Sequence, residues 1–131
     1  MADVLDLFAH VGDAAFAVDK RQSIVFWNAA AETLLGFSAA EATGRFCWHL
    51  LDGHTPAGRL FCGPGCPILQ ILRHNITPQP FTLVVRSADH RRLHVNVSTV
   101  PVPTSEDPDD MLLLVHLFRE DHPFAPGADP Q

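Results

Sequence analysis

The sequence predicts a single α+β domain, and the order of its apolar segments is the main reason. Two short apolar runs, 14–18 and 23–27, flank a polar turn, and three more runs fill the last third of the chain. Short Ala-rich and Leu-rich segments broken by Gly and Pro lie between the two groups. The predicted order is therefore a helix, two strands, several short helices and three strands.

Length and charge bound what the chain can do. With 131 residues, one domain can bury about two-thirds of the surface that the unfolded chain exposes. A formal net charge of -6 argues against direct contact with nucleic acid, because phosphate binding needs a positive stripe. No apolar run approaches the roughly 20 residues that span a bilayer, so a cytoplasmic chain without membrane contact is expected. Three cysteines, an odd number, favour reduced thiols over a disulfide scaffold.

The N-terminal segment is expected to be an amphipathic helix. Val4, Leu7, Phe8 and Val11 recur at helical spacing, which predicts a helix over 3–11. The expected division of the chain is an N-terminal helix at 1–12, a domain at 13–119 and a tail or linker at 120–131.

The first helix after the opening hairpin has signals at both of its ends. Asn28 stands where it can cap an Ala-rich helix over 29–35, and Gly36 can end that helix. Ser38-Ala-Ala-Glu41 is a capping box that begins another short turn, and 46–51 is expected to be helical. Pro67 suits the first position of a helix over 68–75.

Three strands are predicted near the C-terminal end, at 81–86, 92–102 and 111–119, with turns at 88–90 and 104–110. The last strand is apolar on both faces, so both of its faces must be covered. One face would line an internal pocket. The N-terminal helix, a second subunit or both would cover the other, and we expect a homodimer there.

Three places in the chain resemble PAS domains. These are the hairpin ending in Phe26-Trp27-Asn28-Ala29-Ala30-Ala31-Glu32 with Leu35-Gly36-Phe37-Ser38 downstream, the pair Gly44-Arg45, and the closing hairpin of 95–102 and 111–118. The resemblance covers about 13–119. It implies a five-stranded antiparallel sheet with short helices on one face.

The resemblance also implies a function. It points to a sensory or dimerisation module of a bacterial signal-transduction or transcription regulator, which binds a small ligand or cofactor in its core. The signal would pass to an effector outside this chain, such as a helix-turn-helix, a kinase or a cyclase. A pure dimerisation module without a ligand is the alternative. Catalysis is not expected, because Cys47 with His49, or Cys66 with His54, lacks a recognisable third orienting group.

A small metabolite is the ligand that this interpretation favours. The candidate pocket residues are Asn28, Arg45, His49, Asn96 and Ser98, whose polar groups would orient it, with Trp27 and Phe46. The alternatives are that Asn28 serves as a helix cap and that Asn96 and Ser98 face the outer side of the sheet. The apolar side chains expected to line the core or its cavity are Phe16, Val18, Val25, Trp27, Leu34, Phe37, Phe46, Ile68, Ile71, Leu72, Phe81, Leu83, Val95, Val97, Leu112 and Leu114.

Three cysteines suggest further chemistry. Cys47, Cys62 and Cys66, with His49 or His54, could compose a zinc or iron-sulfur site or a redox sensor. The Cys-x3-Cys spacing is looser than the usual zinc knuckle. The favoured interpretation is that Cys47 is a small buried apolar residue and that Cys62 and Cys66 are free or weakly paired thiols. The segment also resembles a subgroup of PAS domains in bacterial regulators with a Cys-rich turn ending in Cys-Pro.

Flavin and haem are two other cofactors to weigh. Gly44-Arg45-Phe46-Cys47 resembles the flavin-binding signature of light-oxygen-voltage domains, but Phe46, Trp48 and Leu51 replace its polar flavin contacts. Haem requires an axial histidine inside the pocket. The candidates for that ligand are His74, His94 and His116.

Overall fold

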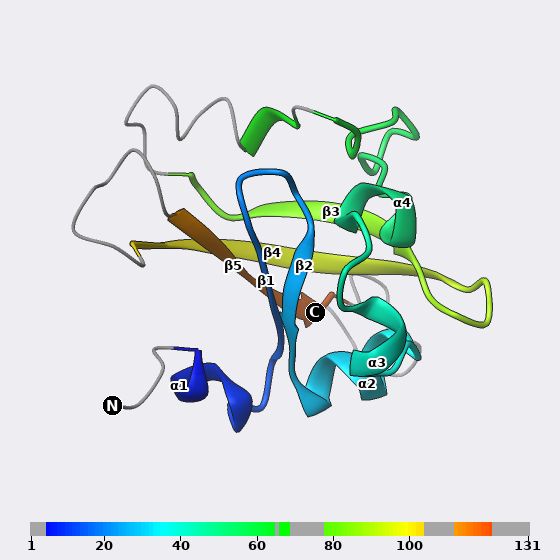
Figure 1. Cartoon of the computed structure of the whole chain (residues 1–131). Coiled ribbons are helices and arrows are strands. Elements are labelled where there is room, and N and C mark those ends of the chain that lie inside the picture. Colours follow the sequence, from blue (N-terminus) through cyan, green and yellow to red (C-terminus); the bar gives the residue numbers. More distant parts are fainter. Residues whose placement is uncertain (1–4, 65, 69–77, 104–111, 122–131) are drawn as a thin grey trace, which may run out of the picture.

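The fold is an antiparallel sheet with short helices packed along it (Figure 1). The computed structural model describes residues 5–64, 66–68, 78–103 and 112–121. Five strands pair in the order β2-β1-β5-β4-β3, which confirms the predicted fold class. The elements are α1 (Asp6–Ala9), β1 (Ala14–Val18), β2 (Ile24–Trp27), α2 (Ala29–Leu35), α3 (Ala39–Ala42), α4 (Cys47–Leu51), β3 (Phe81–Arg86), β4 (Arg92–Pro103) and β5 (Leu112–Glu120).

The opening and closing hairpins join through β1 and β5. These strands pair antiparallel, with Phe16 opposite His116 and Ala14 opposite Phe118. Two strands that are about a hundred residues apart in the chain therefore lie side by side (Figure 1). All five residues of β1 are buried, so this strand is covered on both faces.

The inner face of the sheet packs against the helices that follow the first hairpin. Phe16, Val97 and Phe118 belong to one buried cluster with Leu35 of α2 and Leu51 of α4. The Phe16 ring lies at the centre of an aromatic group, with its centroid 5.3 Å from that of Trp27 and 5.1 Å from that of Phe118. Alternation along each strand places these side chains on the same face.

The outer face carries a second, smaller buried cluster. Leu5 and Phe8 pack there against Ala17, Val102 and Val115. The N-terminal segment therefore contributes to the cover of the outer face through the predicted Phe8, joined by Leu5, which the sequence did not predict. Leu7 is 71% exposed and Val11 is 36% exposed.

The N-terminal helix is shorter than predicted, and no side chain caps its start. The helix predicted over 3–11 spans only Asp6–Ala9, and residues 1–4 lie outside the described part. One helical turn can present only a pair at i and i+3 to the sheet, here Leu5 and Phe8. A backbone hydrogen bond also joins the two residues, in which Phe8 N–H donates to Leu5 O at 2.9 Å.

Asn28 does more than cap α2. Its Oδ1 accepts from Ala31 N at 2.8 Å and from Ala15 N at 2.9 Å. Its Nδ2 donates to Phe8 O at 2.9 Å and to Asp13 O at 3.1 Å. One buried amide thus uses both donors and both acceptor positions to join α2, β1 and the N-terminal segment.

The other predicted element ends agree with the structure to within a residue or two where they are described. Gly36 ends α2 in the left-handed conformation, with φ at 81°, and Ser38 and Glu41 form the reciprocal capping box of α3. Pro67 and Ile68 are helical, but the rest of the helix predicted over 68–75 lies outside the described residues. The same is true of the turn at 104–110 and of 122–131 in the predicted tail.

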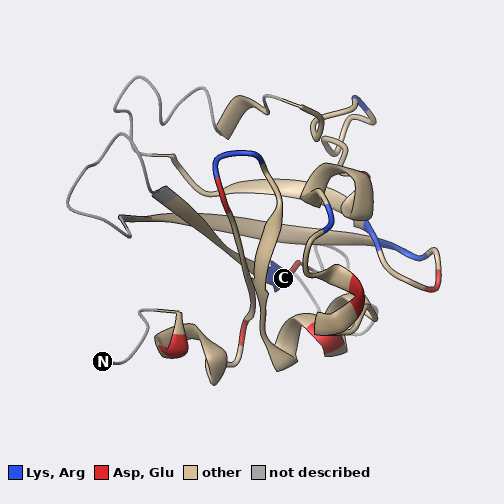
Figure 2. Cartoon of the chain, viewed as in Figure 1, with Lys and Arg blue, Asp and Glu red and all other residues tan. Residues whose placement is uncertain are grey.

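Charged side chains are dispersed over the described part of the chain. Figure 2 shows Lys and Arg residues at the β1–β2 turn and near the β3–β4 turn, with acidic residues on α2 and α3. Within the described residues, no helix is both long enough and apolar enough to cross a membrane.

Replacing Asn28 tests the role of this amide in stability. Asn28→Ala should lower the free energy of unfolding by about 2–4 kcal/mol, because it removes the cap and leaves buried backbone groups without partners. Urea denaturation measures the loss. Asn96→Ala, the same exchange at an exposed position of β4, is the matched control and should cost under about 0.5 kcal/mol. Equal losses for the two variants would contradict the assignment.

Candidate functional site

A small cavity lies between the inner face of the sheet and the middle of the chain. Its volume is about 40 Å³. A cavity of this size holds only a few non-hydrogen atoms, because one water needs about 10–15 Å³. Its lining residues are Phe16, Gln22, Cys47, Trp48, Leu51, Phe61, Cys62, Cys66, Ile68, Phe81, Leu83, Val97, His116 and Phe118.

The three cysteines reach this cavity from different segments. Cys47 begins α4, where its N–H donates to Gln22 O at 3.0 Å. Cys62 lies in the following loop, and its N–H donates to Gly53 O at 3.1 Å. A Cβ at Gly53 would lie 2.4 Å from Cys62 Sγ, so only glycine lets this thiol sit where it does. Cys66 stands at the helix entry before Pro67.

Burial keeps two of these thiols protonated. Desolvation, with smaller contributions from the neighbouring thiols Cys62 and Cys66, raises the pKa of Cys47 to about 12. Burial likewise raises the pKa of Cys62 to about 11. Since the thiolate is the nucleophile, both side chains are weak nucleophiles at neutral pH. They behave as small apolar groups that carry a soft sulfur donor.

His116 is the ionisable side chain of the opposite wall. It projects from β5 into the cavity lining, and its ring centroid lies 5.3 Å from that of Phe16. Its Nδ1 lies 3.0 Å from Thr99 Oγ1 on β4. Burial lowers the pKa of His116 to about 4, so the imidazole is neutral at physiological pH.

Gln22 closes one side of the cavity. It occupies the β1–β2 turn in the left-handed conformation, with φ at 67°. Its Nε2 donates to Gly63 O at 3.0 Å, which fastens the cysteine-bearing loop to the first hairpin. Nothing in the sequence indicated a role for this residue, since a Gln in a polar turn carries no signal of burial.

The seven side chains predicted as ligand-pocket candidates do not line this cavity. The Asn28 side chain already makes four hydrogen bonds to the backbone. Trp27 Nε1 donates to Phe37 O at 2.9 Å. Asn96 and Ser98 alternate with the inward Val95 and Val97, so they face the outer side of the sheet. Arg45, Phe46 and His49 are exposed around α4.

Some of the apolar positions predicted for the core do line the cavity. These are Phe16, Ile68, Phe81, Leu83 and Val97. Ile71 and Leu72 lie outside the described residues, as does the side chain of Leu112.

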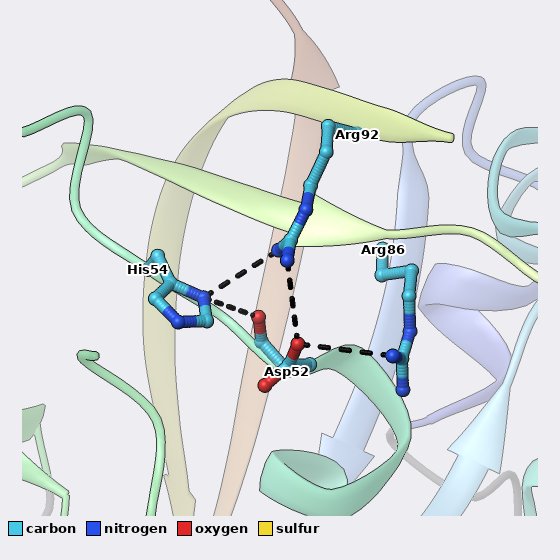
Figure 3. A network of polar contacts seen from close by, with 4 residues as sticks. All are labelled: Asp52, His54, Arg86 and Arg92. Atoms are coloured by element: carbon cyan, nitrogen blue, oxygen red, sulfur yellow. Dashed lines mark hydrogen bonds and ion pairs between the residues drawn. The ribbon is translucent and has the colours of Figure 1, made fainter. Parts of the chain in front are cut away.

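The histidines proposed to accompany the cysteines lie elsewhere. His49 is exposed and packs its ring edge against Trp48. His54 belongs to the polar network of Figure 3, where its Nδ1 lies 2.9 Å from Asp52 O and 3.5 Å from Arg92 Nη1. A guanidinium beside this imidazole opposes cation binding there. Neither histidine shares the cavity with Cys47 or Cys66, so the paired nucleophile and base are not assembled.

The network of Figure 3 has a structural role. Arg86 and Arg92 project from β3 and β4 toward Asp52, with their nearest guanidinium nitrogens 3.9 Å and 3.6 Å from Asp52 Oδ2. His54 also pairs with Val84 of β3 through an isolated bridge. These contacts hold the segment after α4 against the sheet edge.

Neither haem nor flavin fits the cavity in this conformation. Its 40 Å³ is far below the roughly 300 Å³ at which pockets for drug-sized ligands begin. Of the haem candidates, His116 lines the cavity, His94 is exposed and His74 lies outside the described residues. Cys47 lines the cavity, but Arg45 and Phe46 of the flavin-like motif lie at the surface.

Comparison with known proteins places the fold in a family. A family profile described as "PAS fold" matches residues 3–116. No curated protein matches the chain.

Three solved structures illustrate the likeness. The PAS domain of an HTR-like protein from Haloarcula marismortui has a TM-score of 0.65 at 17% identity, covering 88% of this chain and 86% of that one. The PAS domain of nitrogen regulation protein NR(II) from Vibrio parahaemolyticus gives 0.62 at 18%, covering 92% and 100%. An RNA-binding light-oxygen-voltage receptor gives 0.61 at 21%, covering 89% and 32%. These identities show the fold alone.

The neutral His116 gives a pH test. Its pKa in the folded chain, about 4, lies below the value near 6.5 of an unfolded histidine, so protons favour the unfolded state. Its contribution to stability is complete above about pH 6.5 and is lost as pH falls toward 4. Between pH 7 and pH 4, the free energy of unfolding measured by urea denaturation should fall by roughly 3 kcal/mol less in His116→Gln than in the native chain.

His94→Gln, at an exposed position of β4, is the control and should follow the pH curve of the native chain. A His116→Gln variant with the native pH dependence would show that this ring is not buried in neutral form.

Proposed function

The chain belongs to the PAS family, and from this premise we propose that it is the sensory and dimerisation module of a bacterial signal-transduction or transcription regulator. PAS domains are generally sensory rather than catalytic. In this proposal the chain binds a small ligand in its inner cavity, has no catalytic activity of its own and acts in the cytoplasm without contacting nucleic acid.

The observation that carries the proposal is the cavity between sheet and helices. It places the polar side chains of Gln22 and His116, and three sulfurs, inside an otherwise apolar wall. Binding sites for small molecules commonly combine an apolar lining with a few placed polar groups. A core without a ligand role has no need of a buried imidazole, which costs free energy to desolvate.

We also propose a route by which the signal passes through the sheet. His116 and Phe118 line the cavity from β5, and the next residue, Arg119, forms an ion pair with Asp13 at 3.2 Å. In this proposal, a change in the position of the cavity wall would be transmitted to the ion pair between the end of β5 and the start of β1. We propose that an effector such as a helix-turn-helix, a kinase or a cyclase lies beyond this point in the full protein.

Dimerisation is supported by apolar side chains left exposed around the outer face. Leu7 lies on α1 and Val11 follows this helix, while Val100 lies on β4 opposite Val115 of the outer cluster. A second copy of the chain would remove them from water. The alternative function, dimerisation without a ligand, uses this surface alone.

Native mass spectrometry tests the ligand. The native mass of the purified chain should exceed its denatured mass by one bound species. Val97→Ile adds a methylene to the cavity wall and should weaken binding roughly 10-fold or more, since one extra methylene is worth that much in a tight pocket. Val100→Ile, on the outer face, is the matched control. Equal native and denatured masses would favour the dimerisation module instead.

Light scattering coupled to size-exclusion chromatography tests the dimer. Leu7→Lys with Val100→Lys should convert the chain to a monomer, because each change places a charge in the proposed apolar contact. Thr33→Lys, on the exposed side of α2, should leave the mass at that of the dimer. A native chain that is monomeric at all concentrations tested would refute the proposed interface.

A further inference from the structure

A groove of ligand size lies where α2 meets the ends of three strands. Its volume is about 470 Å³, against about 40 Å³ for the inner cavity. Pockets for small molecules typically span roughly 300–1,000 Å³. The start of β1, one side of α2, the start of β4 and the end of β5 enclose this space, which we call the sheet-end groove.

The floor of the sheet-end groove is apolar. Leu93 and Phe118 lie beneath it and are buried, and Leu34 of α2 is partly buried at its side. Ala14 and Ala30 contribute small side chains to the same lining. An apolar group of a ligand would therefore meet an apolar surface there. Because Phe118 also lines the inner cavity, the two spaces share one side chain.

Four of the residues that line the groove are charged. Arg91 and Arg119 carry the positive charges, and Asp13 and Glu120 carry the negative ones. Their formal charges cancel, so the lining as a whole favours neither a simple anion nor a simple cation. A ligand that carries one charge of each sign can be complementary to both kinds of side chain.

Both arginines have hydrogen-bond donors beyond those in their ion pairs. Arg119 Nη2 donates to Asp13 Oδ2 at 3.2 Å, and Arg91 Nε donates to Asp89 Oδ2 at 2.9 Å. Each contact engages one nitrogen of a guanidinium that carries five N–H groups. A carboxylate in the groove could therefore accept hydrogen bonds from both side chains.

We propose that the sheet-end groove binds a small zwitterion of the α-amino-acid type with an apolar side chain. Its carboxylate lies between Arg91 and Arg119, and its ammonium group lies near Asp13 and Glu120. Its side chain lies on the apolar floor. This site is separate from the inner cavity and does not depend on the ligand proposed for that cavity.

Such a ligand would act on a contact between two strands. The ion pair of Arg119 with Asp13 joins the end of β5 to the residue before β1. A bound carboxylate would compete with Asp13 for the Arg119 guanidinium, and a bound ammonium would compete with Arg119 for the Asp13 carboxylate. The ligand would therefore exchange this ion pair for contacts of its own.

Titration of the full, isotopically labelled chain with L-leucine tests the proposal, with the backbone amide chemical shifts as the readout. Saturable shifts are expected at Asp13, Leu34 and Leu93. Three probes each lack one feature of leucine: isocaproate lacks the ammonium, leucinamide lacks the carboxylate and glycine lacks the apolar side chain. Each should bind roughly 5-fold or more weakly than leucine.

Arginine variants test the charged contacts. Arg91→Gln and Arg119→Gln should each weaken leucine binding by roughly 5-fold or more, because each removes charged donors. Arg59→Gln, the same exchange at an exposed position outside the groove, is the matched control and should bind as the native chain does. Arg91 and Arg119 are also exposed, so all three variants should fold.

Several results would overturn this assignment. They are the absence of a saturable shift at millimolar leucine, equal binding of leucine and isocaproate or leucinamide, and native affinity in both groove variants. Val97→Ile, in the inner cavity, should leave leucine binding unchanged, and weaker binding would place leucine in that cavity instead. If native mass spectrometry finds a ligand but leucine does not bind, the sensory function stands and only the sheet-end site fails.

Discussion

Burial of β1 on both faces is the constraint on which the rest of the structure depends. Its inward Phe16 meets Trp27, Phe118 and His116, while its outward Ala17 lies under the N-terminal Leu5 and Phe8. A strand so covered needs every backbone group paired, and the amide of Asn28 supplies the partner for Ala15 N. The same amide fixes the start of α2 and the end of the N-terminal segment. One polar side chain thereby connects the two faces of the sheet.

The inner cavity follows from the way in which the middle of the chain returns to this sheet. The bridges of His54 to Val84 and to Leu60, with the ion pairs of Asp52, bring the loop that contains Cys62 against β3. Gly53 allows the close approach of the Cys62 sulfur. The loop that contains Cys62 and strand β5 line the same cavity from separate segments of the chain. A small shift of that loop would therefore change the contacts that it makes with the β5 side chains. This is the property that a sensory domain requires.

The sequence predicted the fold better than the site, and the reason is physical. Periodicity, caps and turns are local signals, so Asn28, Gly36 and the Ser38 capping box identified the helices, and the apolar runs identified the strands. Which side chains face a cavity depends on contacts between distant segments. Asn96 and Ser98 share a strand with cavity residues but lie on its other face, and Asn28 has no capacity left for a ligand. His116 lies two residues from both Leu114 and Phe118, so the alternation of the strand did indicate that its side chain faces inward. Nothing in the turn around Gln22 indicated that this residue would be buried.

Nuclear Overhauser spectra of the isotopically labelled chain test the central claim most directly, that the middle of the chain closes a cavity over the inner face of the sheet. Two sets of cross-peaks are expected. One joins the rings of Phe61 and Phe81, whose centroids lie 5.0 Å apart across the loop and β3, and the other joins Phe16 and His116, at 5.3 Å within the sheet. Cross-peaks within the sheet without any between Phe61 and Phe81 would leave the inner face open and contradict this account.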